Sequence, residues 1–235
     1  MNKKLKFKRV LLKLSGETLA SSENSVDCNE VTKVAEEIKT ALSSNMELAI
    51  VVGAGNIWRG ANKNISRVTA DKMGMLATVI NAFAISRTLI ALGLKSVVLS
   101  ASPVTGFCES FSQEKADSYL KQKYVVVFAG GTGNPFFTTD TTAALRAAEI
   151  NADIVLKATQ VDGIYTADPK KDLSAKKYDK ISYSEAIDKK LKIMDITAFQ
   201  ICMENKIPIS VFNFHKKGNL KKVLKGEKKI GTLVY

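Results

Sequence analysis

Short apolar runs alternate with amphipathic helical stretches along this chain of 235 residues. Residues 9–14 and 48–52 are apolar runs of strand length, and apolar side chains recur at helical spacing over 31–42 between them. A strand, a helix and a strand in this order form a βαβ unit, in which the two strands are parallel. The alternation therefore predicts an α/β fold built around a mainly parallel sheet.

The same alternation continues to the end of the chain. Further strands are expected at 96–99, 125–128, 153–157 and 208–212, and further helices at 69–92, 112–122, 141–151, 183–190, 196–204 and 220–224. The polar stretch 161–178 is expected to be a loop. Because no linker or internal repeat interrupts the pattern, we expect one three-layer αβα domain over residues 1–235.

Composition excludes several classes of protein. No uninterrupted run approaches the ~18 apolar residues of a membrane span, and the basic start lacks a small-residue cleavage site, so we expect a cytoplasmic protein without a membrane segment. Cys28, Cys108 and Cys202 lie far apart and are expected to be thiols rather than zinc ligands or disulfides. The net charge of +12 is attributed to a lysine-rich surface without a nucleic-acid partner, because no binding module accompanies it.

Three of the expected strands end in glycine-rich turns, at 15–16, 53–60 and 130–133. Glycines let a backbone approach a ligand, and N–H groups at a helix start attract anions. Trp58 and Phe136 occupy the last glycine position of a dinucleotide fingerprint, and no Gly-Lys dipeptide forms a P-loop. A tight turn without a ligand would explain any one of these segments. Three at one sheet edge predict a phosphate-binding edge.

Charged residues accompany these turns. Lys13 lies inside an apolar strand, where a lysine either extends to the surface or meets a negative ligand, and Arg59 follows the second turn. Asp71, Asp140 and Asp195 lie near the starts of expected helices. Capping is the common role of an aspartate there, and orienting cations near a phosphate is the functional alternative. His215 is the only histidine, which excludes triads that depend on histidine.

Turn signals mark the segment 157–169, which follows the strand expected at 153–157. Tyr165 could stack on a base, while Thr159 and Asp168 could bond a base or a ribose. These residue types are compatible with a nucleotide but do not specify one.

Six motifs occur in an order that resembles the bacterial uridylate kinases of the amino-acid-kinase superfamily. They are Lys-Leu-Ser-Gly at 13–16, the glycine-rich turn at 53–60 with Arg59, Ala-Asp-Lys-Met-Gly-Met-Leu-Ala-Thr at 70–78, the stretch 131–140 with Thr-Gly-Asn-Pro-Phe-Phe-Thr-Thr-Asp, the segment 157–169, and Lys-Ile-Met-Asp at 192–195. The resemblance covers essentially the whole chain. It implies a three-layer αβα sandwich, a homohexamer, and transfer of the ATP γ-phosphoryl group to UMP with Mg²⁺ in pyrimidine nucleotide biosynthesis.

The resemblance also implies roles for individual residues. A catalytic group would comprise Lys13, Arg59, Asp140 and Asp195. ATP would contact Lys13, Leu14, Ser15, Gly16, Gly55, Arg59, Thr159, Gln160, Tyr165 and Asp168. UMP would contact Ala54, Asp71, Thr132, Gly133, Asn134, Pro135, Phe136, Phe137, Thr138 and Thr139. The acceptor would thus bind mainly to residues 1–150 and ATP mainly to residues 151–235.

One departure from the family pattern is Ala54, where many relatives have glycine. Alanine tolerates a positive φ less well, so the second turn is expected to differ slightly. Two other functions remain open. A related kinase that phosphorylates a carboxylate or carbamate would lack the Phe-Phe-Thr-Thr-Asp stretch. A basic nucleic-acid-binding or regulatory protein would show salt-sensitive binding without kinase activity.

Overall fold

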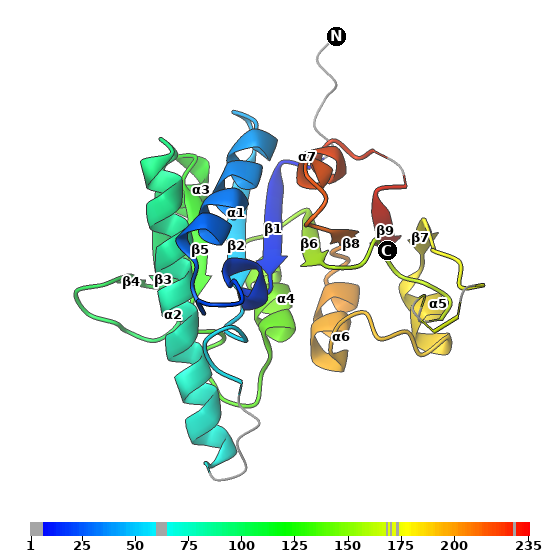
Figure 1. Ribbon diagram of the computed structural model, residues 1–235, viewed down its shortest axis with the longest axis horizontal. Coiled ribbons are helices and arrows are strands. Elements are labelled where there is room, and N and C mark those ends of the chain that lie inside the picture. Colours follow the sequence, from blue (N-terminus) through cyan, green and yellow to red (C-terminus); the bar gives the residue numbers. More distant parts are fainter. Residues whose placement is uncertain (1–6, 60–64, 168, 170, 173, 228) are drawn as a thin grey trace.

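One sheet runs through the middle of the protein. The computed structural model describes residues 7–59, 65–167, 169, 171–172, 174–227 and 229–235. The strands are β1 Arg9–Leu14, β2 Glu47–Val52, β3 Ser96–Ser100, β4 Glu109–Ser110, β5 Val125–Ala129, β6 Ile154–Thr159, β7 Lys180–Ile181, β8 Ile209–Asn213 and β9 Gly231–Val234. Their order in the sheet is β4-β3-β5-β2-β1-β6-β8-β9-β7 (Figure 1). Neighbouring strands are parallel except for β8 and β9, which are antiparallel.

Helices cover both faces of this sheet. They are α1 Cys28–Ala41, α2 Arg67–Ala91, α3 Gln113–Lys121, α4 Thr139–Glu149, α5 Tyr183–Asp188, α6 Ile196–Glu204 and α7 Asn219–Leu224, and the short 3-10 helix η1 is Gly16–Leu19. One hydrophobic core joins α1, α2 and α7 to the sheet, and a second core joins α3, α4, α5 and α6 to the opposite face. The expected three-layer αβα sandwich is confirmed.

Alternating side chains of β1 show how the sequence builds both cores. Val10, Leu12 and Leu14 belong to the core under α1 and α2, whereas Leu11 belongs to the core under α4. A strand with apolar residues on both faces is typical of a parallel sheet covered on both sides. Lys13 follows this alternation and lies on the α4 face, so its charge must be neutralised there.

Every strand and helix expected from periodicity is present within a few residues of its expected bounds. The three strands that periodicity missed are β4, β7 and β9. β4 and β7 are two residues long and β9 is four, so none is long enough to show a pattern of its own. β9 pairs with β8 in the antiparallel direction and extends the sheet beyond its parallel part.

Helix α2 is, by length and composition, apolar enough to cross a membrane, with a mean hydropathy of 1.5 over its best 18-residue window. No uninterrupted apolar run signals this in the sequence, because Lys72 and Arg87 interrupt it. Such a helix is weak evidence for a membrane, since core helices of soluble proteins meet the same criterion. α2 packs against α1, β3 and β5 on one side and exposes Leu76 and Ile80 on the other.

Candidate active site at the carboxyl edge of the sheet

The first two glycine-rich turns contact each other at the carboxyl ends of β1 and β2. The Gly53 N–H donates to the Leu14 carbonyl over 3.0 Å. A Cβ on Gly16 would lie 2.6 Å from the Gly53 carbonyl oxygen, closer than real Cβ contacts allow. Only glycine therefore permits the two turns to meet. Ala54 is not among the residues with positive φ, so its methyl group causes no backbone strain in this turn.

Helix α2 supports two of the turns through side chains that the sequence analysis missed. Asn81, fully buried, donates from Nδ2 to the Gly53 carbonyl over 2.7 Å and exchanges amide hydrogen bonds with Asn56. Thr78 Oγ1 accepts the Gly130 N–H over 2.8 Å. The signal that could have found them is spacing, because positions 78 and 81 share one helix face with Asp71 within an otherwise apolar helix.

A buried cluster of one acid and two lysines lies between β1, β6 and α4. Lys13 and Lys157 are register partners on the adjacent parallel strands β1 and β6. Asp140, in the first turn of α4, pairs with Lys13 Nζ over 3.1 Å and with Lys157 Nζ over 2.6 Å. The three side chains are only 13–15% exposed. Lys157 was missed as a site residue, although a lysine within a buried strand is the same signal that singled out Lys13.

The charges of this cluster determine its ionisation. Burial opposes ionisation of Asp140, but the positive charges of Lys13 and Lys157 outweigh it and hold the pKa of the Asp140 carboxyl below its usual range. Burial lowers the pKa of the Lys157 ammonium group, against the opposing effect of Asp140. Two ammonium groups thus lie in a largely dry site around Asp140, with the Asp195 charge also acting on Lys157, and such a pair of cations favours an anionic ligand.

Asp195 links α6 to α4. It caps α6 by accepting the Ala198 N–H over 2.8 Å, and it accepts hydrogen bonds from the hydroxyls of Thr138 and Thr141. The adjacent Ile193 carbonyl accepts from Lys157 Nζ over 2.6 Å. The segment before α6 is thereby fixed against the buried cluster. Asp195 acts through other residues in this arrangement, whereas Asp140 lies between the two lysines.

A pocket of about 290 Å³ reaches Thr139, the residue before Asp140. It lies among the N-terminal half of α2, the second turn and the segment that leads into α4. Of the residues expected to bind UMP, it is lined by Ala54, Asp71, Thr132, Asn134, Phe137, Thr138 and Thr139. Gly133, Pro135 and Phe136 belong to the same segment but are not among its described lining residues. Gly55, expected to contact ATP, and Trp58 and Arg67 also line it.

Residues expected to bind ATP lie on both sides of the cluster. Thr159 ends β6 two residues after Lys157, about 7 Å farther along the strand. The Gln160 carbonyl accepts a hydrogen bond from Asn213 at the end of β8, and Tyr165 forms an isolated bridge with Lys177 farther along the loop. Asp168 lies outside the described residues.

The remaining expected ATP contacts lie near the first two turns. Ser15 caps η1 by accepting the Glu17 N–H. The Leu14 side chain is buried in the core, so only its backbone could meet a ligand. Arg59 is exposed and forms an ion pair with Glu17, while its Nε donates to the Gly55 carbonyl over 3.2 Å. The structure therefore places Arg59 at the rim of the site, whereas Lys13 lies inside it.

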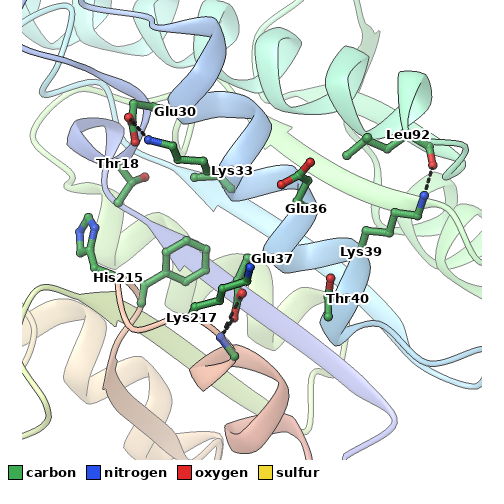
Figure 2. A pocket seen from close by; sticks show the side chains of 13 residues that line it. Thr18, Glu30, Lys33, Glu36, Glu37, Lys39, Thr40, Leu92, His215 and Lys217 are labelled. Atoms are coloured by element: carbon green, nitrogen blue, oxygen red, sulfur yellow. Dashed lines mark hydrogen bonds and ion pairs between the residues drawn. The ribbon is translucent and has the colours of Figure 1, made fainter.

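A larger groove of about 750 Å³ lies between α1 and the segment 214–218, and Thr18 of η1 also lines it (Figure 2). Its charged side chains are largely bound to neighbouring protein groups. Lys33 pairs with Glu30, Lys39 donates to the Leu92 carbonyl, and Glu37 accepts the Gly218 N–H. Because these charges are already compensated, the groove is a weaker candidate for a phosphorylated ligand than the carboxyl edge.

Buried lysines, glycine-rich turns and strand ends at one edge of an αβα sheet define a phosphoryl-transfer enzyme. The chain belongs to the amino acid kinase family, whose model matches residues 8–213. Among its curated relatives is the uridylate kinase of Brucella anthropi, which is 51% identical over 97% of this chain and 96% of the relative. The UMP kinase structures from Bacillus anthracis and Ureaplasma parvum superpose with TM-scores of 0.93 and 0.91, at 37% and 36% identity. Each superposition covers 97% of this chain, together with 96% of the Bacillus anthracis chain and 98% of the Ureaplasma parvum chain.

Proposed function

We propose that this chain is an ATP-dependent UMP kinase that converts UMP and ATP to UDP and ADP in pyrimidine nucleotide biosynthesis. The observation that carries this proposal is that the start of α4 contributes both to the 290 Å³ pocket and to the buried cluster. Thr138 and Thr139 line the pocket, and Asp140 follows them between Lys13 and Lys157. An acceptor in the pocket would have its phosphate close to two cations.

The chemistry requires charge compensation more than proton transfer. Donor and acceptor are both anionic, and charge spreads over the oxygens of the transferred group. Lys13 and Lys157 would stabilise this charge, and Asp140 would keep the two ammonium groups apart and oriented. A phosphate monoester has a second pKa of about 6, so its attacking oxygen is already ionised at pH 7. A general base is therefore unnecessary, which agrees with a site that contains no histidine.

The donor nucleotide would lie on the C-terminal half of the sheet edge. Thr159, Gln160 and Tyr165 supply a hydroxyl, backbone groups and an aromatic ring within reach of the carboxyl ends of β6 and β8. This division assigns the acceptor mainly to residues 1–150 and ATP mainly to residues 151–235. Ser15 and Gly16, at the end of β1, lie between the two halves and would face the phosphates.

Mg²⁺ would accompany ATP. No three His, Cys, Asp or Glu side chains are grouped as metal ligands among the described residues. Mg²⁺ in phosphoryl-transfer sites is held largely by substrate phosphates and water, with one or two carboxylates, so a dedicated protein cage is not needed. Asp140 Oδ1 is buried and pairs with Lys13 without a well-directed hydrogen bond, so Asp140 would be the carboxylate to approach such a complex once ATP is bound.

Self-association would cover the exposed side of α2. Met73, Leu76, Ile80 and Ile90 form an apolar stripe there, with Leu76 62% and Ile80 54% exposed. A contiguous exposed apolar stripe marks an interaction surface. We propose that copies of this chain meet along α2 in a cytoplasmic homohexamer that binds neither nucleic acid nor membrane.

A coupled ADP-release assay with UMP, CMP, dUMP and AMP tests the function. The expected result is turnover with UMP well above that with CMP. Uracil and cytosine differ at one edge by the exchange of a hydrogen-bond acceptor for a donor, and the pocket must distinguish the two. Equal use of CMP would reject the substrate assignment. Salt-sensitive nucleic-acid binding without ADP release would instead favour the non-enzymatic alternative.

A further inference from the structure

The backbone of Phe136 adopts a conformation that its residue type disfavours. Its φ is +74°, in the left-handed region, and its side chain is 61% exposed. A bulky aromatic residue with positive φ is strained, and such strain persists only where neighbouring groups hold it. Phe136 lies in the segment 131–138, here called the acceptor loop, which lines the 290 Å³ pocket through Gly131, Thr132, Asn134, Phe137 and Thr138. Something outside the acceptor loop must fix this turn.

Asp71 and Arg67, one helical turn apart on α2, hold Phe136 from outside the loop. Asp71 Oδ2 accepts the Phe136 N–H over 2.7 Å. Arg67 Nε donates to both carboxylate oxygens of Asp71, over 2.9 and 3.0 Å. The Arg67 guanidinium also lies over the Phe136 ring, 5.8 Å from its centroid. One arginine therefore contacts both the carboxylate that holds the strained residue and the ring of that residue.

We propose that Arg67 is a positioning residue for the acceptor, which completes a latch of Arg67, Asp71 and Phe136 that keeps the acceptor loop over the pocket. This inference rests on the proposed function, since it concerns binding of UMP in that pocket. Without Arg67 the Asp71 carboxylate can change rotamer and release the Phe136 N–H, so the strained turn relaxes. The affinity for the acceptor should fall, while ATP binding on the other half of the sheet edge should be preserved.

The fold should not depend on this latch. The Arg67 side chain is 59% exposed, and exposed ion pairs contribute little to stability. A loss of UMP affinity without a change in melting temperature is therefore the signature of positioning. A purely structural role would lower stability and affect both substrates.

Trp58, the only tryptophan, lines the same pocket and gives a binding signal that does not require turnover. Titration of Trp58 fluorescence with UMP, together with KM values for UMP and ATP, would be compared for wild type, Arg67→Gln and Arg67→Lys. We expect Arg67→Gln to raise the Kd and KM for UMP roughly fivefold, with KM for ATP and kcat changed less than about twofold. Arg67→Lys, which retains the charge, should recover part of the loss.

Lys189→Gln is the matched control. Lys189 pairs with Glu185 one helical turn earlier on α5 and lies 4.9 Å from the Tyr178 ring centroid, so it makes the same two kinds of contact outside the pocket. It should leave UMP affinity unchanged. Wild-type UMP affinity in Arg67→Gln, or an equal loss for ATP, would overturn the latch.

Two further measurements separate the latch from the proposed function. Hydrogen exchange of a peptide that covers 131–138 should be faster in ligand-free Arg67→Gln than in wild type, and unchanged exchange would contradict the latch. If wild type neither binds nor phosphorylates UMP, the proposed function is wrong, and the exchange result still decides whether the latch exists. In a Phe136→Gly background, where glycine accepts positive φ, Arg67→Gln should have a smaller effect on UMP affinity, and additive effects would contradict the coupling.

Discussion

At the scale of single residues, the pairing of Lys13 and Lys157 around Asp140 makes both lysines testable. We expect Lys13→Ala and Lys157→Ala each to lower kcat by orders of magnitude, because each removes a positive charge from a dry site where the phosphoryl group would pass. Near-native far-UV circular dichroism would show that the fold is retained. An active Lys13→Ala enzyme would remove Lys13 from the mechanism.

Asp140 contributes to stability with a defined pH dependence. Its pKa is lower in the folded protein than the ordinary value of 3.8, so its contribution is present above that value and is lost as pH falls through the folded pKa. Asp140→Asn leaves two buried cations unpaired and should cost about 3 kcal/mol at pH 7. For a chain of this size that lowers Tm by roughly 6–12 °C.

The difference in Tm between wild type and Asp140→Asn should shrink as pH falls below 4. Asp188→Asn, at an exposed position on α5, is the control and should leave Tm unchanged. Calorimetry at intervals of about one pH unit between pH 3 and 8 checks both expectations. A constant difference across this range would contradict the role of the Asp140 charge.

Lys157 predicts how kcat changes at alkaline pH. Burial lowers its pKa below the ordinary 10.5, so its proton is lost at a lower pH than that of an exposed lysine. We expect kcat at saturating substrates to decline below pH 10.5. In a Lys157→Arg variant that retains activity, the decline should move to higher pH, because a guanidinium stays protonated. An alkaline decline at the same pH in both proteins would exclude Lys157 as its cause.

At the scale of elements, α2 connects the carboxyl-edge turns to the rest of the fold. Thr78 accepts the Gly130 N–H, which is buried. Thr78→Val would leave that N–H without a partner and should cost about 1–3 kcal/mol in unfolding free energy. Thr88→Val is the control on the same helix, since Thr88 Oγ1 donates only to the Ala84 carbonyl of its own helix. Urea unfolding of both variants measures the difference, and equal costs would contradict a special role for Thr78.

The same elements show which features can be predicted from sequence. β1 and α6 match their expected bounds because their apolar spacing is local, and Lys13 was identified because a charge stands out in an apolar strand. Lys157 gives the same signal, but its role in the site depends on the register between β1 and β6. That register places Lys157 beside Lys13, which is 144 positions away in the sequence. Asn81 and Thr78 likewise acquire their roles only when α2 packs on the turns. Local sequence patterns do not identify side-chain partners that lie far apart in the chain.

At the scale of the whole molecule, the exposed side of α2 predicts the assembly. Leu76 and Ile80 lie one turn apart, and with Met73 and Ile90 they extend the apolar stripe along the helix. Burying such side chains between copies would remove apolar surface from water, at about 25 cal/mol per Å². Charges at its centre should therefore prevent association while each copy retains its own two cores. The acceptor site, at the N-terminal end of α2, would then lie on the same helix as the interface.

The variant Leu76→Lys/Ile80→Lys should sediment as a smaller species than wild type and should keep its far-UV circular dichroism. Ile187→Lys is the matched control, because Ile187 is 49% exposed on α5, on the opposite face of the sheet. That control should sediment as wild type does. Because Asp71 and Thr78 lie on the same helix as the stripe, the dissociated variant should also bind UMP more weakly than the control. A dissociated species with unchanged UMP affinity would show that the pocket is complete within one copy.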